Sequence, residues 1–164
     1  MICNNKKPFL VYVNCMTYNH APYIKYALDG FTMQQTTFPF VCIIADDCSQ
    51  DGTGEVIWQY LKDFFEIDDE DVSERGDTDD YTMLYARHKH NMNCYFAVYF
   101  LKYNHFGKKD KRLYFTRWTN GTKYMALCEG DDYWIDPHKL DMQVNFLETI
   151  PDYGMCFTDF NMKI

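Results

Sequence analysis

The sequence predicts an α/β fold in which helices cover both faces of a mostly parallel sheet. Strand-like and helix-like segments alternate along the 164 residues, which is the order that repeated β–α–β units produce. The strand-like segments are continuous apolar runs, as expected for strands that are buried on both faces. The length suits one domain. We therefore expect a single domain over residues 1–164, with an acidic insertion at 66–80.

The first part of the chain provides two strand–helix pairs. Buried strands are expected at 9–15 and 40–45. Between them, apolar residues recur at the i, i+3, i+4, i+7 spacing of a helix. Helical spacing resumes over 56–64, and Ser49 or Thr53 is the expected N-cap of this second helix.

The segment 66–80 carries the net charge of the chain. It holds nine of the 24 acidic residues and one of the 16 basic residues, so its charge of −8 equals that of the whole sequence. No basic excess remains elsewhere, which argues against nucleic acid as a partner. An EF-hand that starts at Asp71 would put Arg75 and Thr82 where carboxylate ligands are needed. A solvated loop is the simpler interpretation.

The second part of the chain continues the alternation. We expect strands at 81–87, 123–128 and 153–160, and helices at 95–103 and after 137. The period of the run 95–103 is ambiguous, and we favour a helix because a crossover fits between its neighbours. Residues 107–120 are polar and basic, which predicts a loop or a short irregular helix. Asp136 is the expected cap of the last helix, and Pro137 its first residue.

The cysteines and the N-terminal residues indicate the compartment. Seven cysteines occur without a C-x-x-C pair, and most lie inside apolar runs, as is usual for buried reduced thiols. No apolar run approaches the roughly 20 residues of a membrane span. Residues 1–15 lack the long apolar core and the cleavage site of a signal peptide. The sequence therefore predicts a soluble cytoplasmic protein.

Polar clusters follow three of the predicted strands. Their sequences are MTYNH, ADDCSQD and EGDDYW. Because ligands of open α/β sheets bind beyond the carboxyl ends of the strands, we expect the three clusters to converge. Asp46 and Asp47 could instead be capping residues in a turn. The adjacent charges of Asp131 and Asp132 are not needed as caps, since Asp136 serves the next helix.

A divalent cation explains the second acidic pair. Mg²⁺ and Mn²⁺ prefer carboxylate oxygens, and they usually bind through one or two carboxylates together with substrate phosphates. The sequence contains no G-x-x-x-x-G-K-[ST] loop and no dinucleotide fingerprint that could neutralise a diphosphate. We therefore expect an ion to do so, with a nucleotide or another phosphate compound as the ligand.

At this point the sequence resembles the nucleotide-sugar half of the family 2 glycosyltransferases, which have the GT-A fold. The resemblance rests on VYVNCMTYNHAPYIKYALDGFTMQQT, IIADDCSQDGT and KYMALCEGDDYWIDPHKLDMQVNFLE, and it covers about 9–160. It implies a metal-dependent, inverting transfer of a sugar from a UDP-sugar donor to a saccharide or lipid-linked acceptor, in cell-surface polysaccharide synthesis. It also implies Mn²⁺ or Mg²⁺ as the ion and peripheral membrane association of the full-length protein.

The resemblance assigns roles to the residues of the three clusters. The implied donor site contains Met16, Thr17, Tyr18, Asn19, Asp46, Asp47, Asp131 and Asp132. Tyr18 would pack on the uracil ring, Asp47 would accept a hydrogen bond from the uracil N–H, and Asp46 would support the turn. Asp131 would reach hydroxyls of the ribose or the sugar. Asp132 would bind the metal, so that residues 129–132 stand for the acidic D-x-D motif of the family.

The acceptor-side half of the family is missing from this sequence. The general base is expected beyond Ile164, and we expect a truncated product with little or no transfer activity. One alternative is a receiver-type signalling domain that binds Mg²⁺, but its acidic pair belongs after the first strand. Here the pairs follow the second and the fourth predicted strands. The other alternative is a nucleotide-binding module without turnover.

Two other stretches allow more than one interpretation. The run HKHNMNC at 88–94 holds three candidate zinc ligands but no fourth, and a solvated turn is the preferred interpretation. By the family resemblance, Asn91 and Asn93 in this run are expected near the donor pocket. Trp134 could either fill core space or shape the sugar pocket.

Overall fold

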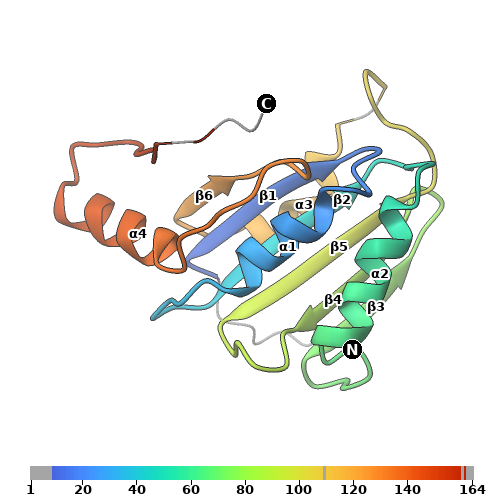
Figure 1. Cartoon of the computed structure of the whole chain (residues 1–164), viewed down its shortest axis with the longest axis horizontal. Coiled ribbons are helices and arrows are strands. Elements are labelled where there is room, and N and C mark those ends of the chain that lie inside the picture. The colour runs from blue at the N-terminus through green and yellow to red at the C-terminus, as the bar shows by residue number, and fades with distance from the viewer. Residues whose placement is uncertain (1–8, 109, 160, 162–164) are drawn as a thin grey trace.

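A six-stranded sheet with helices on both faces forms the centre of the computed structural model, which describes residues 9–108, 110–159 and 161 (Figure 1). The strands are β1 (Val11–Thr17), β2 (Phe40–Asp46), β3 (Ser73–Asp77), β4 (Tyr81–Arg87), β5 (Cys94–Leu101) and β6 (Tyr124–Leu127). The helices are α1 (Ile24–Thr32), α2 (Thr53–Phe64), α3 (Arg112–Thr119) and α4 (Lys139–Thr149). None of the helices in these residues is both long and apolar enough to cross a membrane.

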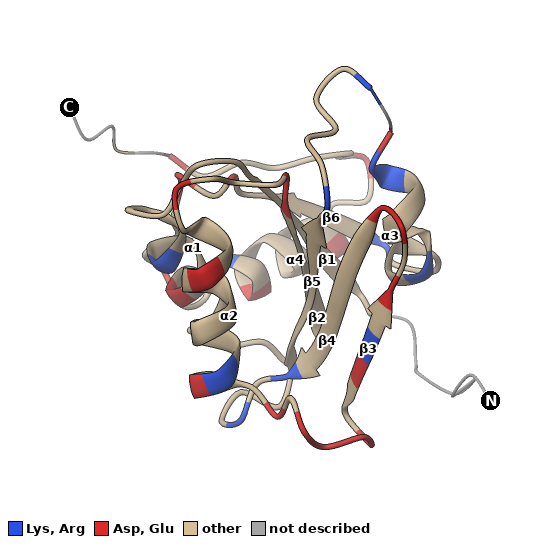
Figure 2. Cartoon of the chain, turned by 90° about the vertical axis from the view of Figure 1, so that its right-hand side faces the viewer, with Lys and Arg blue, Asp and Glu red and all other residues tan. Residues whose placement is uncertain are grey.

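The order of the strands is β3-β4-β5-β2-β1-β6. The pairs β5–β2, β2–β1 and β1–β6 are parallel, and β4 and β3 extend the sheet as an antiparallel hairpin. Seen along the sheet, α1 and α2 lie on one side and α3 on the other (Figure 2). The predicted fold class, a mostly parallel α/β sheet with helices on both faces, is therefore confirmed, as are the strands predicted at 9–15, 40–45, 81–87 and 123–128.

β2 lies within the sheet and every one of its residues is buried. Cys42 and Ile44 belong to the same core cluster as Leu28 of α1. Ile43 points to the opposite face and belongs to the cluster that contains Trp118 of α3. Since complete burial of a large apolar side chain stabilises a fold by about 1.5–3 kcal/mol, this strand anchors both layers of helices.

The prediction of a helix at 95–103 is wrong, because this run forms most of β5. The strand pairs parallel with β2, where Ile44 faces Val98, and antiparallel with β4, where Tyr85 faces Ala97. Phe96 and Val98 pack in the core cluster under α1, and Ala97 packs in the cluster under α3. A strand that is buried on both faces is apolar at every position, so its sequence shows no period of two.

The prediction of a solvated loop over all of 66–80 is partly wrong. Ser73–Asp77 form β3, an edge strand in which Arg75 pairs with Leu84 of β4. Figure 2 shows acidic residues along β3 and the turn before it. Glu74 of this strand accepts two hydrogen bonds from Arg117 of α3, over 2.7 and 2.8 Å. Charged residues on an edge strand also discourage pairing with another chain.

The region 107–120, predicted as a loop or a short irregular helix, contains α3. The helix expected to open at Pro137 is α4, which begins at Lys139 with His138 as its N-cap residue, while Asp136 Oδ1 accepts a hydrogen bond from His138 N. The buried side chain of Gln34 ties α4 to the end of α1, because its Oε1 accepts from Leu140 N and its Nε2 donates to Gly30 O.

The prediction of a strand at 153–160 is wrong for the residues that the structure describes. Residues 153–159 form no strand and are almost all exposed, and Phe160 lies outside the described residues. Apolar composition alone suggested a strand here. A strand also needs a partner for its backbone N–H and C=O groups, and β6 pairs only with β1 among the described strands.

Candidate functional site

The polar clusters that follow β1, β2 and β6 meet at one edge of the sheet. β1 lies between β2 and β6, and Thr17 at its end pairs with Asp46. The backbone N–H of Asp47 donates to Thr17 O over 2.9 Å, and that of Gly130 donates to Met16 O over 3.0 Å. The convergence expected from the parallel strand ends is therefore present.

Four hydrogen bonds of 2.8–3.0 Å join the loop after β1 to the loop after β2. They run from Asn19 N to Ser49 Oγ, from Gln50 N to Asn19 Oδ1, from His20 N to Thr53 Oγ1 and from Ala21 N to Asp51 Oδ2. The hydroxyls of Ser49 and Thr53, which we expected at the N-cap of α2, accept bonds from the β1 loop instead. Gly52, with φ of 96°, is the N-cap residue. Asn19 itself has φ of 57°, a conformation that asparagine tolerates better than most residues.

The side chains after β1 point in different directions. Tyr18 is 46% exposed, so its ring is available to a ligand. Thr17 is buried, and the side chain of Met16 is half-buried against the core cluster under α3. Of these three residues, Tyr18 presents its side chain at the surface, and the backbone of the other two fixes the neighbouring loops.

Asp46 is buried at the end of β2, and its Oδ1 accepts a hydrogen bond from Ser49 Oγ. Burial raises the pKa of this carboxyl, although the bond from Ser49 acts in the opposite direction. A Cβ atom on Gly54 would lie 3.2 Å from Asp46 Oδ2, so the glycine leaves room for the carboxylate. These contacts place Asp46 inside the turn.

Asp47 is 4% exposed and is held by the loop between β5 and α3. Its Oδ1 accepts from His105 N over 2.8 Å, and its Oδ2 accepts from Lys111 Nζ over 2.5 Å. Asn104 Nδ2 also donates to the backbone oxygen of Asp47. None of these three partners could be predicted from the sequence, because no spacing rule connects residues that are 57 to 64 positions apart.

The ring of His105 anchors this loop in the core. Nδ1 lies 2.7 Å from Tyr103 O, and Nε2 lies 3.0 Å from the hydroxyl of Tyr114. Because a carbonyl oxygen only accepts hydrogen bonds, the hydrogen is on Nδ1, and the hydroxyl of Tyr114 donates to Nε2. The buried imidazole thus fixes the backbone N–H that holds Asp47.

The acidic turn after β6 presents its carboxylates at the surface. Asp131 and Asp132 are exposed, and Asp132 N donates to Glu129 O over 3.2 Å. Partial burial raises the pKa of Glu129, and the charges of Asp131 and Asp132 raise it further. The mutual repulsion that the sequence suggested is thus present in the fold.

Gly130 allows this turn to approach β1. A Cβ atom at this position would lie 2.5 Å from Thr17 Oγ1, 2.6 Å from Thr17 Cβ and 2.9 Å from His20 Nδ1. Contacts this short do not occur between real side chains, so glycine is required at this point of the turn. The glycine is visible in the EGDD motif of the sequence, but the close approach to β1 that explains it is visible only in the fold.

The acidic turn fits a divalent cation only with help from a ligand. Among the described residues, no three side chains of His, Cys, Asp or Glu are grouped so that they could hold a metal ion. Magnesium and manganese ions commonly bind through one or two carboxylates and complete their coordination with phosphate oxygens and water. The exposed oxygens of Asp131 and Asp132 suit such an ion.

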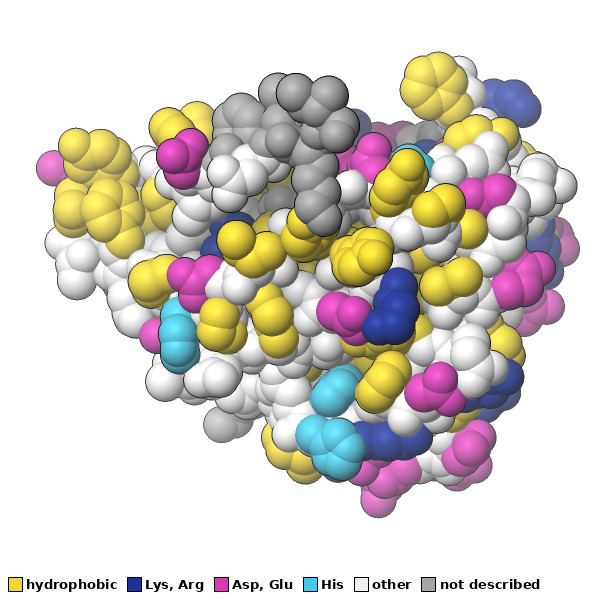
Figure 3. Space-filling model, viewed as in Figure 1, with side chains coloured by type: hydrophobic (Ala, Val, Ile, Leu, Met, Phe, Trp, Pro, Cys, Tyr) yellow, Lys and Arg dark blue, Asp and Glu magenta, His cyan; other side chains and the backbone are white. Residues whose placement is uncertain are grey.

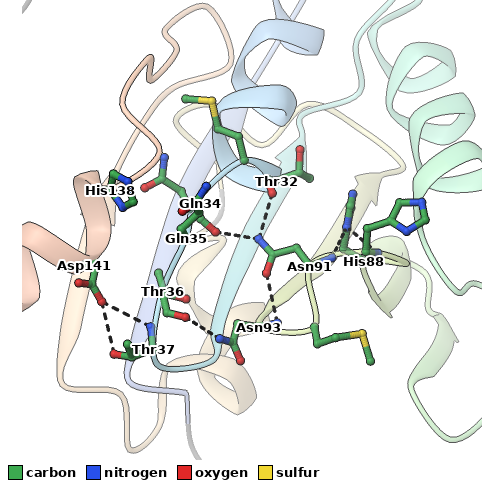
Figure 4. Close-up of a pocket in the computed structure, with 13 residues that line it drawn as sticks. Thr32, Gln34, Gln35, Thr36, Thr37, His88, Asn91, Asn93, His138 and Asp141 are labelled. Atoms are coloured by element: carbon green, nitrogen blue, oxygen red, sulfur yellow. Dashed lines mark hydrogen bonds between the residues drawn. The ribbon is translucent and has the colours of Figure 1, made fainter.

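A hollow lies at the other end of the strands, where β2 and β5 begin (Figure 4). It is lined by residues 32–37, 88, 90–93, 138 and 141. Its polar groups bind one another. His88 Nδ1 accepts from the backbone of Asn91, and the side-chain amide of Asn91 donates to the carbonyls of Thr32 and Gln34. Asn93 likewise donates to Thr36 O. These asparagines precede β5, so they lie far from the cluster at the end of β2, unlike our expectation.

Trp134 packs in the core. Its ring lies 5.1 Å from that of Phe31, centroid to centroid, and its backbone sits against Gly30 of α1. Lys139 Nζ lies over the indole ring at 5.1 Å. Of the two interpretations left open by the sequence, these contacts favour the core one.

Comparison with known proteins bears directly on this site. Residues 13–76, which include the clusters after β1 and β2, match the family model described as glycosyl transferase family 2. The resemblance to the family 2 glycosyltransferases is confirmed. Uncharacterized proteins of Mycobacterium tuberculosis and Mycobacterium bovis are 33% identical to this chain over 142 residues. The aligned region is 87% of this chain and 32% of each relative. The chain therefore spans about a third of the length of the curated relatives it matches.

Solved structures confirm the GT-A fold of this chain. The S. aureus TarS fragment 1–349 in complex with UDP superposes with a TM-score of 0.54 at 21% identity, over 85% of this chain and 32% of the TarS chain. The mannosyltransferase PcManGT from Pyrobaculum calidifontis, in complex with GDP-Man and Mn²⁺, superposes with a TM-score of 0.53 at 17% identity, over 87% of this chain and 33% of its own.

Proposed function

We propose that this chain forms the nucleotide-sugar site of a metal-dependent, inverting glycosyltransferase with a UDP-sugar donor. The observation that carries the proposal is the meeting of an exposed aromatic ring, a buried carboxylate and two exposed carboxylates at the carboxyl edge of β1, β2 and β6. Solved structures of the same fold contain UDP, UDP-GlcNAc, or GDP-Man with Mn²⁺. These ligands support a nucleotide sugar here as well.

The proposed base pocket uses Tyr18 and Asp47. The exposed ring of Tyr18 offers a face on which uracil stacks. The carboxylate of Asp47 has acceptor positions beyond the two that His105 N and Lys111 occupy, so a uracil N–H can share it. In the free protein Lys111 keeps the buried charge of Asp47 paired, and the loop that carries Lys111 must adjust as the base enters.

The proposed diphosphate end of the site is the acidic turn. Asp131 accepts hydrogen bonds from hydroxyls of the ribose or the sugar, and Asp132 is the residue that would hold Mn²⁺ or Mg²⁺. When bound, such an ion stabilises the negative charge of a leaving nucleoside diphosphate. The carboxylates alone would repel the donor, because Glu129, Asp131 and Asp132 stand together.

We propose an acceptor for the full-length protein and not for this chain by itself. A saccharide or lipid-linked acceptor and a role in polysaccharide synthesis are what the family resemblance supports. Inversion needs a base that takes the proton of the attacking hydroxyl, a step that contributes about 10²–10⁴-fold to the rate. We assign no such base among the described residues of this chain, and we expect its sugar transfer to be slow or undetectable.

Calorimetric titration with UDP, ADP and GDP, with Mn²⁺ or with EDTA, tests the proposal. We expect UDP to bind most tightly and only with the metal. Asp132→Asn removes the charge that holds the ion and should weaken the metal-dependent binding about tenfold or more, because a hard cation is attracted to a charged carboxylate much more strongly than to a neutral amide. Asp79→Asn is the matched control: it makes the same change of charge at an exposed residue of the β3–β4 hairpin.

Two results would contradict the proposal. One is equal affinity for UDP in Mn²⁺ and in EDTA. The other is an Asp132→Asn protein that binds UDP with the affinity and metal dependence of the wild type. Equal affinity for the three nucleotides would remove only the role of Asp47 in selecting the base.

A further inference from the structure

His20 connects the three loops of the site. Its N–H donates to Thr53 Oγ1 at the start of α2, and its carbonyl accepts from Tyr23 N and Ile24 N at the start of α1, over 2.8–2.9 Å. Its ring extends toward the acidic turn, where Nε2 lies 3.8 Å from Asp131 Oδ2. The backbone of this residue is thus fixed from both sides, while its side chain faces a proposed donor-binding carboxylate.

The other ring nitrogen defines how the imidazole is oriented. Nδ1 of His20 is buried and has no hydrogen-bond partner, and the same is true of Thr17 Oγ1. Both atoms lie within 2.9 Å of the point where a Cβ of Gly130 would be, so both are close to the backbone of the acidic turn. Because a carboxylate oxygen only accepts hydrogen bonds, the ring must carry its hydrogen on Nε2 to donate to Asp131.

We propose that His20 is a positioning residue, whose Nε2–H orients the Asp131 carboxylate toward a ribose hydroxyl of the bound nucleotide. The proposal rests on the proposed function. The side chain of Asp131 is 54% exposed and stands beside the like charges of Glu129 and Asp132, so nothing on its own turn holds it in one rotamer. An N–H donor aimed at it provides a direction for the carboxylate.

The separation of 3.8 Å is longer than a hydrogen bond. Hydrogen bonds in binding sites are often long in the free protein and shorten in the complex. A ligand hydroxyl on the far side of Asp131, together with a cation on Asp132, fixes the carboxylate and brings it within reach of Nε2. The contact between His20 and Asp131 is therefore expected to form on binding.

Two substitutions of similar polarity separate this role from simple packing. In His20→Gln the side-chain amide nitrogen reaches the place of Nε2, whereas in His20→Asn the shorter amide reaches only the place of Nδ1. Titration with UDP and Mn²⁺ should give an affinity within about twofold of the wild type for Gln and about fivefold weaker for Asn, which is the effect of one lost hydrogen bond. Titration with 3′-deoxy-UDP and 2′-deoxy-UDP identifies the ribose hydroxyl that Asp131 contacts. The analogue that lacks this hydroxyl should bind the Gln and Asn variants with equal affinity.

A double-mutant cycle with Asp131→Asn measures the coupling. If His20 acts through Asp131, adding His20→Asn to Asp131→Asn should weaken UDP binding no further. Fully additive losses would overturn the proposal, as would equal affinities for the Gln and Asn variants. Absence of UDP binding by the wild type would overturn the proposed function too, whereas loss of binding in Asp131→Asn but not in His20→Asn would remove only this inference.

The ring nitrogens of the wild-type protein offer a test that needs no His20 variant. Imidazole ¹⁵N spectra should show the hydrogen on Nε2, with a change in the Nε2 signal on addition of UDP and Mg²⁺. The Asp131→Asn protein should not show that change. A hydrogen on Nδ1, or an identical response in both proteins, contradicts the proposal even if the His20→Asn protein does not fold.

Discussion

At the scale of single residues, the site depends on how closely its loops approach. Gly130 approaches the end of β1, and the two buried polar side-chain atoms that lack partners among the described residues, Thr17 Oγ1 and His20 Nδ1, lie next to it. Sequence reasoning found the carboxylates because a run of like charges is visible in one dimension. His20 and Gly130 could not be predicted as neighbours, because they follow strands that are far apart in sequence and adjacent only in the sheet.

Gly130→Ala should disrupt this approach. The new methyl group would overlap Thr17 Cβ, an atom that no rotamer change can move. We expect a loss of about 1–3 kcal/mol in the free energy of unfolding, measured by urea denaturation, and weaker UDP binding in Mn²⁺. Gly154→Ala is the control, since no atom lies within 4 Å of a Cβ there. Equal stability of the two variants would show that the turn is not tightly packed against β1.

At the scale of elements, the sequence was informative wherever one strand could be recognised by itself. β1, β2, β4 and β6 are short apolar or β-rich runs bounded by polar turns, and these were predicted. β5 was not, because a strand that is apolar on both faces has no period to distinguish it from a buried helix. β3 is a polar edge strand that exists because β4 pairs with it, and the run 153–159 has strand composition but no strand pairing.

The loop between β5 and α3 is held to Asp47 by three contacts, and one of them is an ion pair. Lys111 Nζ pairs with Asp47 Oδ2, and the Asp47 side chain is 6% exposed. Lys111→Met removes the cation and leaves a buried carboxylate with one donor fewer, which should cost about 1–3 kcal/mol in the free energy of unfolding. Lys108→Met, at an exposed position of the same loop, should have little effect.

A second substitution shows whether the buried charge causes this loss. Asp47→Asn in the Lys111→Met background removes the unpaired charge, so the double variant should recover part of the stability in urea denaturation. If the double variant is as unstable as the sum of the two single changes, the Asp47–Lys111 pair does not hold this loop.

At the scale of the whole molecule, the polar site lies at one edge of a sheet whose centre is closed to water. Four cysteines are buried in this centre: Cys15, Cys42, Cys94 and Cys128. The face with α1 and α2 carries exposed apolar side chains interspersed with charged and polar ones (Figure 3). The buried thiols expected from the apolar runs are confirmed for Cys15, Cys42 and Cys128, but the expectation is wrong for Cys156, which is partly exposed because its run forms no strand. Which thiols reach the surface depends on the packing of the helices.

Thiol reactivity therefore reports the opening of the core. Cys48 and Cys156 are partly exposed and should react with iodoacetamide in the folded protein. Burial raises the pKa of the Cys42 thiol well above its ordinary range, and burial raises that of Cys128 to about 12. The thiolate is the reactive form, so these residues should react only when the protein unfolds. Peptide mapping by mass spectrometry identifies which cysteines are modified, and labelling of Cys42 at the rate of Cys48 would contradict the closed core.

The same measurement connects the core to the site at the edge of the sheet. A ligand that binds only the folded protein stabilises it by about 2.7 kcal/mol at one hundred times its dissociation constant. UDP and Mn²⁺ at that concentration should thus slow the labelling of Cys42 about a hundredfold, provided that labelling follows the unfolding equilibrium. They should leave the labelling of Cys156 unchanged, since it lies after α4 and outside the proposed site. Unchanged labelling of Cys42 at saturating UDP and Mn²⁺ would mean that the nucleotide does not bind the folded chain more tightly than the unfolded one.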